Sequence, residues 1–343
     1  MSFTETVVEQ KSVHLLLKAI HFGASDLHLM PNKNDYLLYF RKYGQLVSAG
    51  QLPLELGDRM ISYFKFLSSL DISDKRRPQS GSFQQVLNEQ SIAFRVSTLP
   101  SVFIRESLVI RIMLQDHAIP LSSLSFFKES ANHLLKLVKK RQGILFFTGP
   151  TGCGKSTSLY SLIHYCSNEL KKHVISLEDP VENNQSNLLQ IQVNERAGVT
   201  YASGLKAILR HSPDIIMIGE IRDQETAKIA IEAALTGHLV LTTIHSRDTF
   251  GCLFRLLDLG VSLEELRQTV IGVVAQRLVK KAIAQDEEKF AAIYEILADG
   301  NLAKAVEHVK SGQNFTLPFE LSLEGQMKEG VRLGAITAQV STV

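Results

Sequence analysis

The sequence has no tryptophan and only three cysteines, Cys153, Cys166 and Cys252, among its 343 residues. An odd number of widely spaced cysteines supports neither a disulfide framework nor a zinc knuckle. No apolar run approaches the roughly 20 residues that a membrane-spanning helix needs. The first residues, MSFTETVVEQ, lack the charged-then-apolar pattern of a secretory signal. We therefore expect a cytoplasmic protein without disulfides.

The chain also carries little net charge. Its 37 basic and 35 acidic residues give +2 at pH 7. Because the two signs are interspersed, composition alone decides nothing about nucleic acid. An interleaved set of aromatic and basic residues, such as single-strand binders use for stacking, is not visible. We expect no direct nucleic-acid partner.

The length exceeds that of one typical hydrophobic core, which predicts two domains. Residues 1–114 have the pattern of a small α+β domain, with helices near Val7–Phe22 and Asp58–Leu70 and a hairpin that turns around Tyr43-Gly44. Residues 115–127 contain Pro120 and a serine cluster, which indicates a linker.

Residues 128–343 alternate short apolar runs with helical stretches. ILFF, VISL, IIMI and HLVLTTI are the candidate strands. Strands separated by helices favour a mostly parallel sheet that is covered on both faces. The fold class predicted for this part is α/β, with a helical extension at its C-terminal end.

The segment GPTGCGKS fits the phosphate-loop pattern G-x-x-x-x-G-K-S, between a predicted strand and a predicted helix. Glycines let backbone N–H groups turn toward phosphate oxygens, and the helix N-terminus adds partial positive charge. Lys155 would reach the β- and γ-phosphates of ATP, and the Ser156 hydroxyl would ligate Mg²⁺. The predicted nucleotide-binding residues are Gly149, Pro150, Thr151, Gly152, Cys153, Gly154, Lys155, Ser156 and Thr157.

Acidic residues follow two other predicted strands. Glu178 and Asp179 come after VISL, and Glu220 comes after IIMI. In an open parallel sheet ligands bind beyond the carboxyl ends of the strands. A carboxylate placed there can position and deprotonate the attacking water or hold a metal-bound water. The alternative is that such an acid only caps the next helix, as we expect of Asp223.

Two histidines, His238 and His245, bracket the strand HLVLTTI. His245 lies at its C-terminal end and is the better candidate to contact a phosphate. A lone histidine is more often structural, so both interpretations stay open for His238.

Four segments, GPTGCGKST, ISLEDPVE, PDIIMIGEIRD and TGHLVLTTIHS, resemble in this order the Walker A, Asp, Walker B and His boxes of the type II/type IV secretion ATPases. The resemblance implies a RecA-like P-loop NTPase domain. It makes Glu220 the catalytic carboxylate and leaves magnesium to Ser156, phosphate and water, with help from Glu178. It also places His245, and less directly His238, at the γ-phosphate.

ASDLHL, KRRPQSG and FRVSTLPS resemble the smaller, PAS-like α+β N-terminal domain of the same family. By this resemblance Arg95 and Arg111 supply arginines to a nucleotide that sits between the two domains. Arginine suits such a role through its fixed charge and forked donors. A surface salt bridge is the alternative for either residue.

The four cysteines that form a zinc knuckle in larger family members have no counterpart here, so no zinc is expected. The chain is most similar to competence-type members of Gram-positive bacteria. The resemblance then implies a homohexamer on the inner face of the membrane that hydrolyses ATP to ADP and phosphate. It would act on a polytopic platform protein, and through it on pseudopilins, to assemble a competence pseudopilus for DNA uptake. Alternatives are a pilus-retraction or type II secretion motor and, more distantly, a RecA-like motor that translocates DNA.

Overall fold

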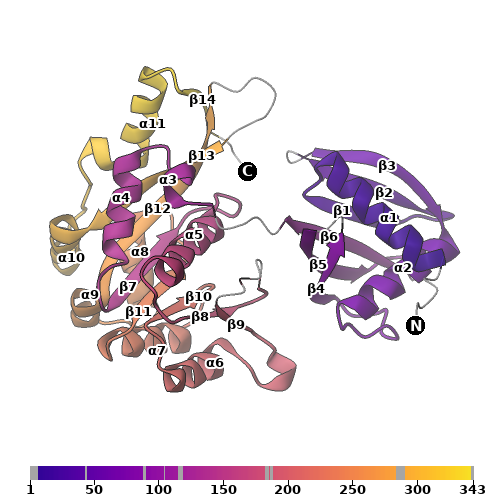
Figure 1. Ribbon diagram of the computed structural model, residues 1–343, viewed down its shortest axis with the longest axis horizontal. Helices are drawn as coiled ribbons and strands as arrows, with labels where there is room; N and C mark the ends of the chain where they lie inside the picture. Colours follow the sequence, from indigo (N-terminus) through magenta and orange to yellow (C-terminus); the bar gives the residue numbers. More distant parts are fainter. Residues whose placement is uncertain are drawn as a thin grey trace. The chain divides into compact units, whose positions relative to one another are not determined.

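The computed structural model describes residues 7–42, 45–87, 90–103, 105–114, 119–181, 185, 188–282 and 290–340. They form two compact units, one made mainly of Met1–Asp116 and one of His117–Val181 with Gln185–Val343 (Figure 1). The division falls inside the segment 115–127 predicted as a linker, of which 115–118 lies outside the described residues. The turn predicted around Tyr43-Gly44 also lies outside them.

The first unit is an antiparallel sheet in the strand order β3-β2-β1-β6-β5-β4, packed against two helices. Alternate residues of β2 (Tyr36, Leu38 and Phe40) are buried beneath the helices, as expected of a sheet with one covered face. The second helix begins at Leu54, directly after Pro53, and therefore earlier than predicted. The elements are α1 (Val7–Phe22), β1 (Asp26–Pro31), β2 (Asp35–Lys42), β3 (Gln45–Pro53), α2 (Leu54–Leu67), β4 (Gln79–Leu87), β5 (Gln90–Pro100) and β6 (Glu106–Leu114).

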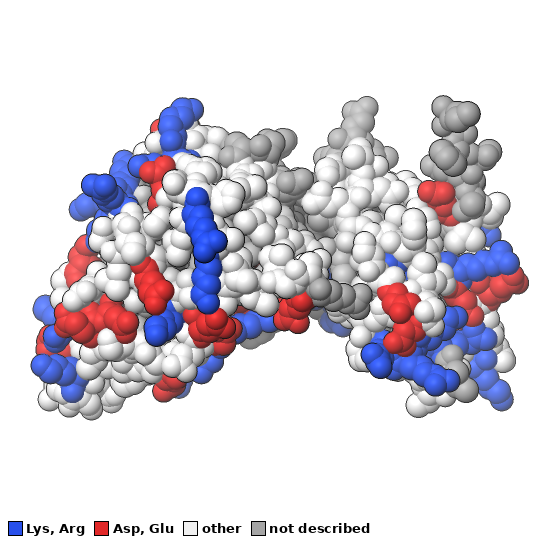
Figure 2. All heavy atoms as spheres, turned by 90° about the horizontal axis from the view of Figure 1, so that it is seen from below, with Lys and Arg blue, Asp and Glu red and all other residues white. Residues whose placement is uncertain are grey.

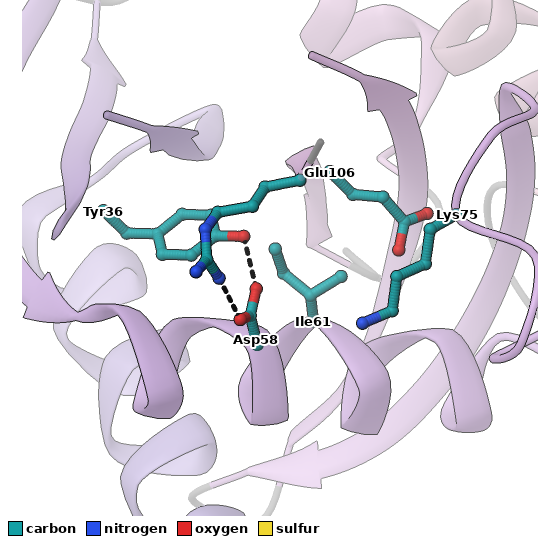
Figure 3. Close-up of a pocket in the computed structure, with 6 residues that line it drawn as sticks. Tyr36, Asp58, Ile61, Lys75 and Glu106 are labelled. Atoms are coloured by element: carbon teal, nitrogen blue, oxygen red, sulfur yellow. Dashed lines mark hydrogen bonds and ion pairs between the residues drawn. The ribbon is translucent and has the colours of Figure 1, made fainter. Parts of the chain in front are cut away.

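Polar side chains tie α2 to the start of β6 in this unit. The Lys65 ammonium is buried and donates a 2.8 Å hydrogen bond to Glu106 Oε1. Nearby, Asp58 accepts hydrogen bonds from Tyr36 and Arg105 (Figure 3). Because a buried charge is costly unless it is paired, the contact between Lys65 and Glu106 helps to fix how α2 sits on the sheet.

The second unit is built on a sheet in the order β13-β12-β7-β11-β10-β8-β9, with β14 paired to β12. The strands from β12 to β9 run parallel, as predicted for the four apolar runs, and β13 and β14 are antiparallel to β12. These strands are β7 (Gly143–Thr148), β8 (Val174–Glu178), β9 (Leu189–Gln192), β10 (Ile215–Ile218), β11 (Leu239–Thr243), β12 (Val270–Lys281), β13 (Phe290–Ala298) and β14 (Ile336–Val340).

Helices cover both faces of this sheet. Successive residues of a strand therefore pack in two different cores, one on each face. In β7, Ile144 and Phe146 pack with one set of helices and Leu145 and Phe147 with the other. The first set is α6 (Tyr201–Ile208), α7 (Gln224–Leu235), α8 (Thr249–Asp258), α9 (Leu263–Thr269) and α10 (Asp299–Ser311). The second is α3 (Leu121–Leu124), α4 (Lys128–Leu137) and α5 (Lys155–Asn168).

The C-terminal part contains strands as well as helices, so the prediction of a purely helical extension is wrong. The long strands β12 and β13 extend the sheet, and β14 follows the helix α11 (Leu323–Arg332). The described residues of the unit also form short 3₁₀ turns at Glu195–Ala197, Leu209–His211 and Phe319–Leu321. On the face of each unit seen in Figure 2, acidic and basic side chains are interspersed, in line with the small net charge.

Candidate nucleotide site

The predicted phosphate loop connects the end of β7 to the start of α5. Gly149 and Gly154 have φ values of 143° and 84°, which favour glycine. A Cβ atom on Gly149 would lie 2.8 Å from both Cys153 Sγ and Gln276 O, so the loop also has no room for a side chain there. The sequence pattern is therefore matched by backbone conformation as well as by residue type.

Lys155, the first residue of α5, bends back over the loop. Its Nζ atom donates 2.8 Å hydrogen bonds to Gly149 O and Pro150 O. An ammonium group has three donors, and the helix N-terminus behind it leaves backbone N–H groups unpaired within the helix. A cradle of this kind fits the phosphates of a nucleotide, and the Ser156 hydroxyl in the first turn fits a Mg²⁺ ligand.

Two contacts hold the loop against the rest of the unit. Gln276 on β12 donates a 2.7 Å hydrogen bond from Nε2 to Cys153 O. At the loop entrance Thr148 Oγ1 accepts a hydrogen bond from the backbone N–H of Ser246, which follows β11. The loop is thus fixed by β12 and by the segment after β11, in which the predicted site residue His245 also lies.

Glu220 lies just beyond the end of β10, with a side chain that is 17% exposed. Its carboxylate is 3.6 Å from His245 Nε2 and accepts a hydrogen bond from Arg222. The backbone beside it is fixed by Thr243 Oγ1, which donates a 2.6 Å hydrogen bond to Gly219 O. Two predicted residues, Glu220 and His245, are therefore brought together.

Gly219 has a structural reason to precede Glu220. A Cβ atom there would lie 3.0 Å from the Tyr201 hydroxyl and 3.5 Å from Glu178 Cα. Burial raises the pKa of the Tyr201 phenol, and the negative charges of Asp179 and Glu220 raise it further. The phenol is therefore a neutral hydrogen-bonding group next to the acids.

Glu178, the last residue of β8, is 3% exposed. Its carboxylate accepts hydrogen bonds from Tyr160, from Ser176 Oγ at 2.7 Å and from Gln190 Nε2 at 3.1 Å. In the sheet order β7-β11-β10-β8, Glu178 lies three strands from the phosphate loop, about 14 Å at ordinary strand spacing. The acids and the loop therefore share the carboxyl edge of one sheet.

The other predicted residues lie elsewhere. His238 precedes β11, at the opposite end of that strand from His245, and its Nδ1 is 3.0 Å from Ala233 O. Arg95 and Arg111 belong to the first unit, where they are paired in register on β5 and β6. Arg111 Nε donates a 2.9 Å hydrogen bond to Asp26 Oδ1. The roles of these three residues stay predictions.

Four site neighbours were not identified from the sequence: Arg222, Tyr201, Tyr160 and Gln276. Arg222 stands inside the GEIRD segment, and its position two residues after Glu220 was an available signal. Tyr201 and Gln276 come from a helix and a strand distant in sequence from the loop. Tyr160 lies on the helix that follows the loop, and only the tertiary structure brings it to Glu178.

Comparison with known proteins identifies the family. The profile described as "Type II/IV secretion system protein" matches residues 3–316. The chain belongs to this family. It is 43% identical to the competence protein ComGA of Bacillus subtilis (strain 168), over 96% of each chain. It is also 40% identical to the type IV pilus assembly ATPase PilB of Acinetobacter baylyi, over 79% of this chain and 47% of that one.

The fold agrees with this assignment. A crystal structure of the pilus retraction motor PilT with bound ADP matches with a TM-score of 0.73 and 24% identity, over 96% of this chain and 95% of that one. The expected α/β class, a RecA-like unit with a smaller α+β unit, is confirmed. The chain is a motor ATPase of the secretion family.

Two further findings concern metals and membranes. The described residues contain no group of three or more His, Cys, Asp or Glu side chains that could hold a metal ion. Within the same part of the chain, no helix has the length and apolar character required to cross a bilayer.

Proposed function

We propose that the protein is a homohexameric motor ATPase that powers the assembly of a competence pseudopilus for DNA uptake. The observation that carries this proposal is the 43% identity to ComGA, which extends over 96% of both chains. Its proposed partners are a polytopic platform protein in the membrane and, through it, the pseudopilins. The hexamer would work as a peripheral protein on the cytoplasmic face of that membrane.

ATP and Mg²⁺ are the cofactors of the proposed reaction. Lys155 binds the β- and γ-phosphates, and Ser156 offers its hydroxyl to the metal. Bound Mg²⁺ neutralises charge that develops on the phosphate oxygens. Glu220 orients the attacking water and accepts its proton, which gives ADP and phosphate as products. His245, 3.6 Å from Glu220, is placed to contact the γ-phosphate.

Residues of the first unit complete the proposal. Arg95 and Arg111 would each present a guanidinium to the nucleotide phosphates, which suit the fixed, forked geometry of arginine. Closing and opening the joint between the two domains during hydrolysis would supply the motion. His238 would then support the strand that leads to His245, through its contact with Ala233 O.

The proposal can be tested in a naturally transformable Gram-positive host that lacks its own pseudopilus ATPase. The wild-type gene, Glu220→Gln and the surface control Glu225→Gln are introduced separately. We expect the wild type and the control to restore transformation and surface pseudopili, and Glu220→Gln to restore neither. Purified wild-type protein should hydrolyse ATP without stimulation by DNA, and Glu220→Gln should bind ATP but not hydrolyse it.

The alternatives predict different results. Strong stimulation of hydrolysis by single-stranded DNA would replace the proposal with a DNA-translocating motor. Normal pseudopili in the strain without the ATPase gene, combined with a loss of their retraction, would replace it with a retraction motor. Rescue of protein secretion but not of transformation would indicate a type II secretion motor.

A further inference from the structure

The carboxylate of Glu178 is held by side chains from three different elements. Tyr160 comes from α5, Ser176 from β8 and Gln190 from β9. We propose that Tyr160 is a positioning residue for the hydrolysis reaction, which couples Glu178 to the helix that carries Lys155 and Ser156. This inference rests on the proposed ATPase function and adds a residue that no sequence motif indicates.

The helix geometry puts Tyr160 where such a coupling is possible. Ser156 and Tyr160 are four residues apart on α5, and residues at this spacing lie on the same face of a helix. The side chain that offers its hydroxyl to Mg²⁺ and the side chain that hydrogen-bonds Glu178 are therefore neighbours. A shift of the first turn of α5 would be transmitted directly to the carboxylate.

The sheet geometry agrees with this placement. Val174 packs in the same core as α5, and residues two apart on a strand point to the same face, so Ser176 and Glu178 also face that helix. Tyr160 and Glu178 are 4% and 3% exposed. Polar groups buried to this degree need hydrogen-bond partners, which fixes both side chains in one orientation.

Tyr160, Ser176 and Gln190 act on Glu178 through their hydrogen bonds to its carboxylate. Hydroxyl and amide groups orient the two carboxylate oxygens of Glu178. An acid with fixed orientation can accept a hydrogen bond from water bound to a metal at Ser156 or from the attacking water. Outer partners of this kind typically change metal affinity or activity by about 10- to 100-fold when they are removed.

The same helix offers a matched control. Ser158 Oγ on α5 lies 2.8 Å from Tyr294 Oη on β13, and Ser158 and Tyr294 are both buried. Tyr294→Phe and Tyr160→Phe each remove one buried phenol hydroxyl that forms a hydrogen bond to or from α5. Only Tyr160→Phe removes a hydrogen bond to Glu178, so any structural weakening of α5 is common to both variants.

The experiment uses the full chain and three readouts: the thermal unfolding midpoint, the Kd of a fluorescent ATP analogue with and without Mg²⁺, and ATPase rates against Mg²⁺ concentration. We expect similar unfolding midpoints for the two variants. In Tyr160→Phe, the factor by which Mg²⁺ increases nucleotide affinity should fall by about tenfold, and kcat should fall by about tenfold as well. Both quantities should stay close to the wild-type values in Tyr294→Phe. Ser176→Ala should change the same two quantities in the same direction.

A double-mutant cycle decides whether Tyr160 acts through Glu178. Adding Tyr160→Phe to Glu178→Gln should produce no further loss of kcat or of the Mg²⁺ effect on nucleotide affinity. Fully additive losses of these two quantities would overturn the inference. It is also overturned if Tyr160→Phe and Tyr294→Phe give the same Mg²⁺ dependence. If Tyr160→Phe does not fold, Ser176→Ala and the Glu178→Gln background carry the same test. A wild-type protein that binds ATP but hydrolyses none would instead refute the proposed function.

Discussion

His245 Nε2 and a carboxylate oxygen of Glu220 lie 3.6 Å apart, although the two residues follow different strands. Their strands, β11 and β10, are parallel neighbours, with Thr242 in register with Ile218. Both side chains therefore emerge at the carboxyl edge of the sheet, where ligands of open α/β sheets bind. His238 precedes the same strand and lies at the opposite edge.

This arrangement predicts different effects for the two histidines. His245→Gln should lower kcat by about 10- to 100-fold with little change in KM, because contributions made only in the transition state appear in kcat. His238→Gln should alter kcat by less than about threefold and act mainly on stability, through the contact with Ala233 O. Steady-state ATPase assays with thermal unfolding distinguish these outcomes, and equal losses of kcat would contradict the difference in role.

The parallel strands of the second unit could be predicted because the sheet is buried on both faces. IIMI and VISL therefore read as continuous apolar runs, and the structure has strands there. The strands β12 and β13 were missed as sheet elements. Their runs VIGVVAQRLVKK and FAAIYEILA do not alternate, and such apolar runs cannot be told from buried helices by periodicity.

In the candidate site, too, some residues could be predicted from the sequence and others could not. The phosphate loop, Glu178 and Glu220 follow from local patterns that end at strand termini. Tyr160 and Gln276 could not be predicted, because each matters through a contact with a residue far along the chain. Local sequence patterns therefore indicated the chemistry, whereas the supporting contacts required the folded structure.

The narrow space around Gly219 gives a second prediction. In Gly219→Ala the new methyl group would lie 3.0 Å from the Tyr201 hydroxyl, so either the Tyr201 side chain or the backbone that carries Glu220 must move by a few tenths of an ångström. We expect kcat to fall by up to about tenfold, since a displacement of about 1 Å can cost about 100-fold and this shift is smaller. Removing the hydroxyl in Gly219→Ala/Tyr201→Phe should recover most of this loss. Normal kcat in the single variant, or no recovery in the double variant, would show that this contact is not responsible.

Gln276 gives a third prediction, in which two effects on stability oppose each other. Gln276→Leu removes the 2.7 Å hydrogen bond to Cys153 O, but it also removes a buried Oε1 atom that has no hydrogen-bond partner among the described residues. Each effect is worth about 1–3 kcal/mol, so the net change in the free energy of unfolding should be within about 2 kcal/mol.

Nucleotide binding should respond differently, because the phosphate loop loses a fixed support in Gln276→Leu. We expect KM for ATP to rise about three- to tenfold, which corresponds to roughly 0.6–1.4 kcal/mol of lost binding. The exposed Gln268 on α9, which donates a hydrogen bond to Glu264, supplies the control Gln268→Leu. Unfolding measurements and ATPase rates at increasing ATP concentration, on both variants, test the expected stability and the expected KM. An unchanged KM in Gln276→Leu would mean that the loop does not need this support.

The buried His28 on β1 makes the first unit sensitive to acid. Burial lowers the pKa of His28 below 6.5, the charge of Asp26 opposes this, and the charges of Arg41 and Arg111 add to the lowering. His28 Nε2 is also buried without a hydrogen-bond partner among the described residues.

The direction of the pH effect follows from proton binding. Below pH 6.5 the unfolded chain protonates His28, whereas the folded unit does so only at lower pH. His28 therefore lowers the stability of the first unit as pH falls below 6.5, by at most about 1.4 kcal/mol per pH unit, and has no such effect above it. Hydrogen exchange of β1 and β6 peptides between pH 7.5 and 5.5, corrected for intrinsic exchange rates, measures this. His28→Leu should show a weaker loss of protection at low pH than the wild type, because it has no imidazole to protonate. If both proteins lose protection equally, groups other than His28 control the acid sensitivity of this unit.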